Sequence, residues 1–325
     1  MKACKSVVTG GAGFIGSHLT EKLLTDGSEV VVVDNFSSGR IDNIKHLMKN
    51  PLLRIMRSDL KKPRRLRELF QECDVIFHLA ANPEVKVNET STRVHFEENI
   101  VATFNLLEAL RLVDEPKVVV LASTSTVYGD ARQIPTPETY GPLEPISTYG
   151  ASKLSCEALL ASYANTFSHR GLILRLANII GPKSNHGVIV DFVRKIRSNP
   201  KCLEILGNGT QTKSYLHITD CIEAISHLTD RFCNQKENID ICNVGSEDQI
   251  TVREIAKIVA REMGTPDIRY VFTRGVNGGR GWRGDVKNMR LSIKKIVETG
   301  WKPRYTSKKA VELAAADLSK SSSVA

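Results

Sequence analysis

Tyr149 and Lys153 lie four residues apart in the segment STYGASK, residues 147–153. The segment begins a predicted helix that runs to about His169, so we expect the two side chains on one helix face, one turn apart. An ammonium group beside a phenol lowers the phenol pKa, because it stabilises the phenolate. A tyrosine held in this way can take a proton from a substrate hydroxyl as a general base. The pair alone is weak evidence, because tyrosine and lysine meet by chance in many helices.

Hydroxyl side chains precede this helix at the end of an apolar run. The strand-like segment KVVVLAS, residues 117–123, leads into Thr124, Ser125 and Thr126. Hydroxyls at the carboxyl end of a parallel strand lie where open α/β sheets bind ligands. Thr124 or a neighbour could therefore share a hydrogen bond with a reacting hydroxyl. The alternative is that these residues only form the turn before Gly129.

The segment TGGAGFIGSH, residues 9–18, spaces Gly10, Gly13 and Gly16 at three-residue intervals between a predicted strand and a predicted helix. In that context the first glycine permits a sharp turn, the second lets the backbone approach a pyrophosphate, and the third lets helix and strand pack closely. The phosphates then lie at the positive end of the helix. A tight turn without a ligand is the alternative.

Asp34 ends the next predicted strand, eighteen residues after Gly16. A carboxylate there accepts hydrogen bonds from an adenosine ribose and repels a 2′-phosphate, which favours NAD over NADP. Arg40 could still serve a phosphate. With NAD bound, the positive nicotinamide ring beside Tyr149 and Lys153 would lower the tyrosine pKa further.

The first half of the chain alternates short apolar runs with amphipathic stretches. The strand-like runs are residues 6–8, 29–33, 53–56, 74–80 and 117–123, and residues 14–25 and 93–113 have the length of crossover helices. Strands buried on both faces need such continuous apolar runs. This order predicts an α/β fold, a Rossmann-like doubly wound parallel sheet with a second, smaller α/β substrate-binding lobe.

We expect the sheet domain over residues 1–171 plus about 216–241, and the smaller lobe over residues 172–215 and 242–318. Within the smaller lobe, residues 251–264 predict a helix with a capping box formed by Thr251 and Glu254. Residues 319–325 are expected to be a disordered tail.

Composition favours a cytoplasmic protein. The chain has 325 residues, a formal net charge of +9 and seven scattered cysteines without a CxxC pair, so we expect reduced thiols and no metal site. No stretch approaches the length of a membrane span. The basic run at residues 61–67 lacks interleaved aromatic residues, so we expect no nucleic-acid partner and no membrane partner.

The motifs together resemble the extended short-chain dehydrogenase/reductase family, in its nucleotide-sugar branch typified by UDP-glucose 4-epimerase. The resemblance rests on TGGAGFIG, Asp34-Asn35, Asp59-Leu60, HLAA at 78–81, Asn99, STSTVYG and YGASK, and continues through LRLANIIGP, KSYLHITD, NVGSED and GDVKNM. It covers nearly the whole chain.

The resemblance implies an NAD site and a catalytic set. Thr124 matches the family's catalytic hydroxyl, Tyr149 its base and Lys153 the partner of that base. The implied NAD contacts, besides Tyr149 and Lys153, are Gly10, Gly13, Phe14, Ile15, Gly16, Asp34, Asn35, Ser38, Gly39, Asp59, Leu60, Leu79, Ala80, Ala81, Asn99 and Ser123.

The resemblance also implies a UDP-sugar site in the second lobe. Lys213 takes the place of an arginine that meets the diphosphate, and a second cation is expected from Arg280 or Arg283, with Arg280 slightly favoured. Met289 aligns with a position that controls access of N-acetyl sugars. The implied substrate contacts are Lys86, Thr124, Ser125, Tyr149, Asn178, Val188, Lys213, Arg280, Arg283, Asp285 and Met289.

The implied reaction is NAD-dependent epimerisation at C4 of UDP-glucose and UDP-galactose through a 4-keto sugar. UDP-N-acetylhexosamine epimerisation, UDP-glucuronate decarboxylation and nucleotide-sugar dehydration are alternatives. Dehydratases usually carry an Asp-Glu pair after the catalytic threonine, where this chain has Ser125 and Thr126. An NAD-binding regulatory scaffold without catalysis is the alternative from another class.

Relatives form a homodimer through a four-helix bundle, which here would use helices around residues 93–113 and 149–165. The leucines available for that bundle are Leu106, Leu107, Leu110, Leu154, Leu159 and Leu160, some of which must face the sheet instead.

Overall fold

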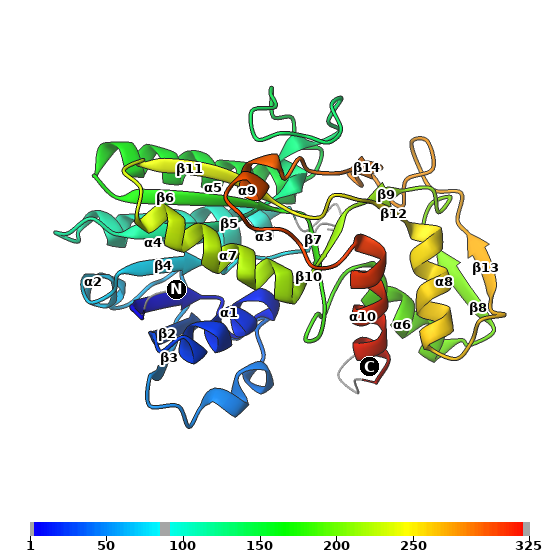
Figure 1. The fold of residues 1–325 in the computed structure, drawn as a ribbon, viewed down its shortest axis with the longest axis horizontal. Helices are drawn as coiled ribbons and strands as arrows, with labels where there is room; N and C mark the ends of the chain where they lie inside the picture. Colours follow the sequence, from blue (N-terminus) through cyan, green and yellow to red (C-terminus); the bar gives the residue numbers. More distant parts are fainter. Residues whose placement is uncertain (1–2, 85–91, 321–325) are drawn as a thin grey trace.

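Seven parallel strands form one continuous sheet in the larger of two lobes (Figure 1). The computed structural model describes residues 3–84 and 92–320. The strand order is β11-β6-β5-β4-β1-β2-β3. The strands are β1 (Lys5–Thr9), β2 (Glu29–Asp34), β3 (Leu53–Arg57), β4 (Val75–His78), β5 (Val118–Thr124), β6 (Arg170–Leu176) and β11 (Ile239–Val244). All five runs predicted as strands lie in this sheet, so the Rossmann-like fold is confirmed.

Helices cover both faces of the sheet because successive strand residues point to opposite sides. Val8 and Val32 belong to the core under α1 (Phe14–Thr25) and α7 (Ile218–Cys233). Val7 and Val33 belong to the core on the other face. The helices of that second face are α2 (Leu66–Gln71), α4 (Ala102–Arg111) and α5 (Thr148–Thr166).

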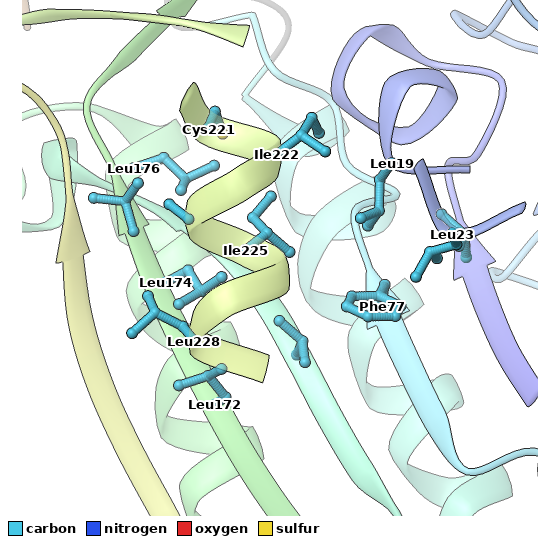
Figure 2. Close-up of a cluster of buried hydrophobic side chains, with 14 of the residues drawn as sticks. Leu19, Leu23, Phe77, Leu172, Leu174, Leu176, Cys221, Ile222, Ile225 and Leu228 are labelled. Atoms are coloured by element: carbon cyan, nitrogen blue, oxygen red, sulfur yellow. The ribbon is translucent and has the colours of Figure 1, made fainter. Parts of the chain in front are cut away.

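Helix α7 seals one face although it comes from the second half of the chain. Figure 2 shows Ile222, Ile225 and Leu228 of α7 packed among Leu172, Leu174 and Leu176 of β6, with Leu19, Leu23 and Phe77 beside them. The chain therefore enters the smaller lobe after β6 and returns to the sheet lobe at α7.

The predicted helix at residues 93–113 is present but irregular. It begins as α3 (Arg93–His95), passes through a π-helical stretch, η3 (Phe96–Val101), and continues as α4. A π-helical stretch widens the turn and turns following residues to a new face. Four of the six leucines proposed for the dimer bundle are fully buried in the core beneath these helices instead, namely Leu106, Leu107, Leu110 and Leu160.

The smaller lobe has its own core between short sheets and three helices. Its helices are α6 (Val188–Ser198), α8 (Val252–Glu262) and α10 (Ser307–Lys320). Its strands pair as β7 (Asn178–Ile180) with β10 (Tyr215–His217), β8 (Cys202–Ile205) with β13 (Arg269–Phe272), and β9 (Thr212–Lys213) with β12 (Ile250–Thr251) and β14 (Asn288–Met289). The predicted capping box on Thr251 and Glu254 is present at α8. The remaining short helices are η1 (Ile41–Asn43), η2 (Lys45–Leu47), η4 (Ser125–Tyr128) and α9 (Lys294–Glu298).

The expected boundaries need adjustment at three places. Strand β6 runs on to Leu176 and β11 to Val244, so both cross the boundaries drawn at residues 171 and 242. Each strand stays in the sheet because its last residues still pair with a neighbour, Val244 with Leu176 and Leu176 with Thr124. The tail was expected to be disordered from residue 319, but Ser319 and Lys320 finish α10, and residues 321–325 lie outside the described residues.

No helix within residues 3–84 and 92–320 combines the length and apolar character needed to cross a bilayer. Over the same residues, no group of three or more His, Cys, Asp or Glu side chains is arranged to hold a metal ion.

A buried ion pair fixes α5 against the sheet. Arg175 of β6 and Glu157 of α5 form a salt bridge of 2.7 Å, with side chains 3% and 5% exposed. Glu157 also accepts a hydrogen bond from Ser123 of β5, and Arg175 donates to the Tyr128 hydroxyl at 2.9 Å. Removing one partner of such a pair leaves a buried charge without compensation.

We expect Arg175→Met to lower the free energy of unfolding by about 3–5 kcal/mol, and replacement of both Arg175 and Glu157 by Met to recover most of the loss. Urea unfolding measures both. The exposed pair Lys294–Glu298, with side chains 81% and 63% exposed, is the matched control. Lys294→Met should change the unfolding free energy by about 0.5 kcal/mol or less. Equal losses from Arg175→Met and Lys294→Met would contradict a structural role for the buried pair.

Candidate functional site

A cavity of about 640 Å³ lies between the two lobes and is lined by residues of both. Its floor includes the carboxyl ends of β1 and β4, where the strand order reverses and open α/β sheets bind ligands. Most of the implied NAD contacts line it, namely Gly10, Gly13, Phe14, Ile15, Gly16, Asp34, Asn35, Ser38, Gly39, Asp59, Leu60, Leu79, Ala80, Ala81 and Ser123, with Tyr149 and Lys153. One implied contact, Asn99, does not.

The glycine loop leaves no room for side chains at two of its glycines. A Cβ on Gly16 would lie 2.1 Å from the Gly10 carbonyl oxygen, and a Cβ on Gly10 would lie 2.7 Å from the Ala80 nitrogen. Gly10 also has φ +70°, which L residues rarely adopt. Gly13 is the N-cap of α1 and no side chain caps that helix end. Gly13 and the first residues of α1, Phe14 and Ile15, line the cavity. This cradle fits a pyrophosphate.

Asp34 is held in a fixed position at the end of β2. Its side chain accepts hydrogen bonds from the Ala12 N–H at 2.9 Å and the Phe36 N–H at 2.8 Å, and the residue is 7% exposed. A Cβ on Gly39 would lie 2.8 Å from the Asp34 carboxylate, so that glycine lets the following loop close over it. A carboxylate has about four acceptor positions, which leaves capacity for ribose hydroxyls.

Thr124, Tyr149 and Lys153 line the cavity together. Burial raises the pKa of Tyr149 to about 12, and a hydrogen bond with Thr124 opposes that rise. Burial lowers the pKa of Lys153. The direction for Tyr149 in the protein itself is opposite to the lowering that the sequence predicted. The physical reason is that removing a phenolate from water costs more than the surrounding protein returns.

Polar side chains join the helix at 93–111 to α5 at every turn. His95 Nδ1 lies 2.9 Å from Thr148 Oγ1, Asn99 Nδ2 donates to Ser152 Oγ at 2.9 Å, and Thr103 Oγ1 lies 3.1 Å from Cys156 Sγ. We call these three contacts the polar ladder. Asn99, which is fully buried, also accepts a hydrogen bond from the Asn82 N–H at 2.7 Å. It therefore supports the loop after Ala81 rather than lining the cavity.

The second lobe contributes the other end of the cavity. Five of the implied substrate contacts line it there, namely Asn178, Val188, Lys213, Asp285 and Met289, and Ser125 lines it from the sheet lobe. Lys213 Nζ lies 2.6 Å from Asp285 Oδ1 and 5.8 Å from the ring centre of Trp282. Lys86 lies outside the described residues.

The two arginines expected at the diphosphate are placed elsewhere. Arg280 donates to Asp130 Oδ1 at 2.9 Å and to the Asp285 carbonyl at 2.6 Å, and Arg283 is exposed; neither lines the cavity. Trp282, between them, does line it. Sequence reasoning missed Trp282, although a tryptophan in a glycine-rich loop is an unusual signal. The loop also contains Gly279 and Gly284, both at positive φ. The backbone conformation at these glycines affects which side chains of the loop face the cavity.

Comparisons with known proteins agree with this arrangement. The sequence matches the NAD dependent epimerase/dehydratase family over residues 6–245. The chain belongs to this family. It is therefore an enzyme-family member with NAD as cofactor, as Asp34 predicted, and the predicted membership of the extended dehydrogenase/reductase group is confirmed.

Individual relatives cover almost the whole chain but differ in substrate. A crystal structure of a UDP-galactose 4-epimerase is 46% identical with a TM-score of 0.84, covering 97% of this chain and 99% of that one. A UDP-glucuronic acid 4-epimerase from Bacillus cereus, in complex with UDP-glucuronic acid and NAD, is 28% identical with a TM-score of 0.85, covering 97% and 98%. A UDP-glucuronic acid decarboxylase of Arabidopsis thaliana is 33% identical over 329 residues, covering 98% of this chain and 69% of that protein. The family therefore leaves the sugar open.

The cradle predicts different effects for two glycines. Gly16→Ala should lower the unfolding free energy by about 1–3 kcal/mol, because its Cβ overlaps the Gly10 carbonyl. Gly13→Ala should cost less than about 1 kcal/mol, because its nearest contact is 3.1 Å, yet should weaken NAD binding by placing a methyl group at the cavity wall. Urea unfolding and NAD calorimetry separate the two. A Gly13→Ala protein that binds NAD like the parent would exclude close approach of the cofactor there.

Proposed function

We propose that the protein epimerises UDP-glucose and UDP-galactose at C4 through a 4-keto sugar, with Tyr149 as the base. The observation that carries the proposal is the continuity of one cavity. It runs from Gly10 and Asp34, past Tyr149 and Lys153, to Lys213 in the second lobe. The 46% identity with a UDP-galactose 4-epimerase over nearly the full chain supports this choice of sugar.

The residues on the cavity wall supply proton transfer. The cofactor held by the glycine loop and Asp34 would supply a hydride acceptor that can also return the hydride. Tyr149 takes the proton of the C4 hydroxyl as the hydride leaves, which produces the ketone, and it returns that proton when the hydride arrives on the opposite face. Both transfers are reversed within one turnover, so no net oxidation occurs.

The raised pKa of Tyr149 sets a requirement on this step. Because burial raises the pKa of Tyr149 to about 12, the phenolate is a minor species at neutral pH in the protein without bound NAD. The base form therefore depends on a positive charge close to the ring. Lys153 lies one helix turn away, and the oxidised nicotinamide of bound NAD carries a second charge. Thr124, hydrogen-bonded with Tyr149, can pass the proton between the sugar hydroxyl and the phenol.

The charges around the sugar end favour a neutral hexose over a hexuronate. Among the described residues, the cations on the cavity wall are Lys61, Lys153, Arg194 and Lys213. Lys61 is within 4 Å of Asp59 and Glu98, and Lys213 is paired with Asp285. Glu84 lines the cavity as well, and its carbonyl oxygen accepts a hydrogen bond from His95, whose ring touches Tyr149. Six carboxylates line the cavity beside these four cations, namely Asp34, Asp59, Glu84, Glu98, Asp191 and Asp285. The carboxylate of a uronate would therefore enter a cavity in which like charges are in the majority.

Met289 supports some access for N-acetyl sugars. The residue is 8% exposed and lines the cavity. Its side chain is flexible and intermediate in size, so it can yield to an acetamido group more readily than an aromatic ring can. We infer that UDP-N-acetyl sugars are slower substrates than the glucose and galactose pair.

A homodimer in the cytoplasm is proposed as the working state. The outer face of the helices at 93–111 exposes Phe96 and Phe104, which are 56% and 44% accessible, and these aromatic side chains would suit a second copy. All seven cysteines are free thiols, as a reducing compartment requires.

Tyr149→Phe tests the mechanism. It should lower kcat for UDP-galactose epimerisation by at least about 100-fold, because the base is lost, while NAD content and UDP-sugar affinity stay unchanged. Tyr163→Phe is the matched control, since Tyr163 lies on the same helix and hydrogen-bonds Glu108 away from the cavity. Wild-type rates in Tyr149→Phe would remove the tyrosine from the mechanism. A parent protein that binds NAD but converts no UDP-sugar would support the regulatory scaffold instead.

Glu84→Gln tests the choice of sugar. Removal of this charge should strengthen UDP-glucuronate binding by about tenfold and leave UDP-glucose binding within about twofold of the parent. Glu115→Gln, at the amino end of β5 and away from the cavity, is the control. NMR of the products from UDP-glucose, UDP-galactose, their N-acetyl analogues and UDP-glucuronate identifies the substrate. Preferred turnover of the N-acetyl pair or of UDP-glucuronate would reject the hexose assignment.

A further inference from the structure

A buried histidine lies against the ring of Tyr149 and belongs to neither the cofactor wall nor the proton-transfer set. His95 is 1% exposed, and its ring centre lies 5.8 Å from that of Tyr149 with the planes at 60°. This is an edge-on aromatic contact. Both ring nitrogens have polar partners, Thr148 Oγ1 at 2.9 Å and the Glu84 carbonyl oxygen at 2.8 Å.

The two partners define which nitrogen carries the proton. A carbonyl oxygen only accepts, so Nε2 must carry the hydrogen that is donated to Glu84. Burial lowers the pKa of His95, which keeps the ring neutral. In a neutral ring Nδ1 then has a lone pair, and the Thr148 hydroxyl donates to it. Two directional bonds thereby hold the ring against that of Tyr149.

Hydrogen bonds within α5 also hold its first turn, since Ser152 Oγ donates to the Tyr149 carbonyl at 2.8 Å. Ser147 caps the helix by accepting a hydrogen bond from the Gly150 N–H at 3.0 Å, and Thr148 itself is exposed apart from its bond to His95. Tyr149 directly follows Thr148 in the sequence and lines the cavity. His95 also reaches the segment that follows Ala81 through the Glu84 carbonyl. One side chain thus connects the base to the segment that borders the sugar end.

We propose that His95 is a positioning residue that fixes the ring of Tyr149 for proton transfer and couples its orientation to the segment at 82–84. The proposal rests on the proposed function, because it assigns the residue that orients the proposed base. His95 does not touch the sugar or the cofactor in this scheme. Its effect is transmitted through Tyr149 alone.

His95→Phe keeps an aromatic ring and removes both hydrogen bonds. We expect kcat to fall about tenfold, equal to the loss of about 1.4 kcal/mol of transition-state stabilisation, with KM and NAD affinity within about twofold of the parent. In a Tyr149→Phe background, His95→Phe should cause no further loss, since no base remains to be oriented. An equal loss in both backgrounds, or no loss in the parent, would overturn the proposal.

His227→Phe is the matched control for the substitution. His227 also bonds a threonine hydroxyl, Thr299 Oγ1 at 2.8 Å, but lies on α7 away from the cavity. Its replacement should leave kcat within about twofold of the parent. If His95→Phe does not fold, His95→Gln serves instead, because an amide at that length keeps the donor to Glu84 and loses the acceptor for Thr148. Partial loss of kcat is expected from His95→Gln, and full parental kcat would count against the proposal.

A readout without turnover separates this proposal from the proposed function. The absorbance titration of NAD-loaded parent minus that of NAD-loaded Tyr149→Phe isolates the ionisation of Tyr149. His95→Phe should shift that ionisation by about one pKa unit, whereas His227→Phe should not. A shift in a protein that epimerises no UDP-sugar supports the positioning role and rejects the proposed reaction. An unshifted ionisation in an active protein rejects the positioning role alone.

Discussion

The polar ladder between the helix at 93–111 and α5 is the constraint on which the site depends. Successive contacts of the ladder are four residues apart on both helices, beginning with His95 and Thr148 and ending with Thr103 and Cys156. Apolar packing tolerates small shifts, but hydrogen bonds require distance and direction together. If α5 moved by one residue along its axis, every contact of the ladder would be lost at once. The ladder therefore fixes the position of Tyr149 and Lys153 along the axis of α5.

Helix α5 is also fixed to the sheet by the ion pair of its Glu157 with Arg175 of β6. A third connection runs from the glycine loop to α5 through buried polar groups. Thr9, at the end of β1, lies 2.8 Å from His78 Nδ1, and His78 Nε2 lies 2.9 Å from Thr103 Oγ1. Burial lowers the pKa of His78 to about 3, so this connection is between neutral groups. The strand that leads into the glycine loop and the helix that carries Tyr149 thus share one hydrogen-bonded network. Such networks are costly when partly satisfied, which restricts the alternative arrangements of the core.

Features encoded by neighbouring residues could be predicted from the sequence, and features decided by distant contacts could not. Gly10, Gly16 and Asp34 were found because a glycine loop and a strand-end carboxylate each leave a local pattern. The π-helical stretch at 96–101 left no such pattern; it contains Asn99, whose hydrogen-bond partners Asn82 and Ser152 belong to other segments. The family resemblance implied a cation from Arg280 or Arg283 at the diphosphate, with Arg280 slightly favoured. Its direction is decided by Asp130, which lies 150 residues earlier in the chain.

The Arg280 contact also bears on how the lobes are joined, because Asp130 follows β5 in the sheet lobe and Arg280 belongs to the smaller lobe. A second connection lies between α1 and the loop after β7, where a His18 ring nitrogen lies 3.1 Å from the Pro182 carbonyl oxygen. Nearby, Lys183 donates to the Asn43 carbonyl at 3.0 Å. The lobes are thus tied at two separate places around one cavity. The epimerisation proposed above would require the sugar to turn between two hydride transfers while the walls stay in place. Ties at both places would hold the walls in position during such a turn.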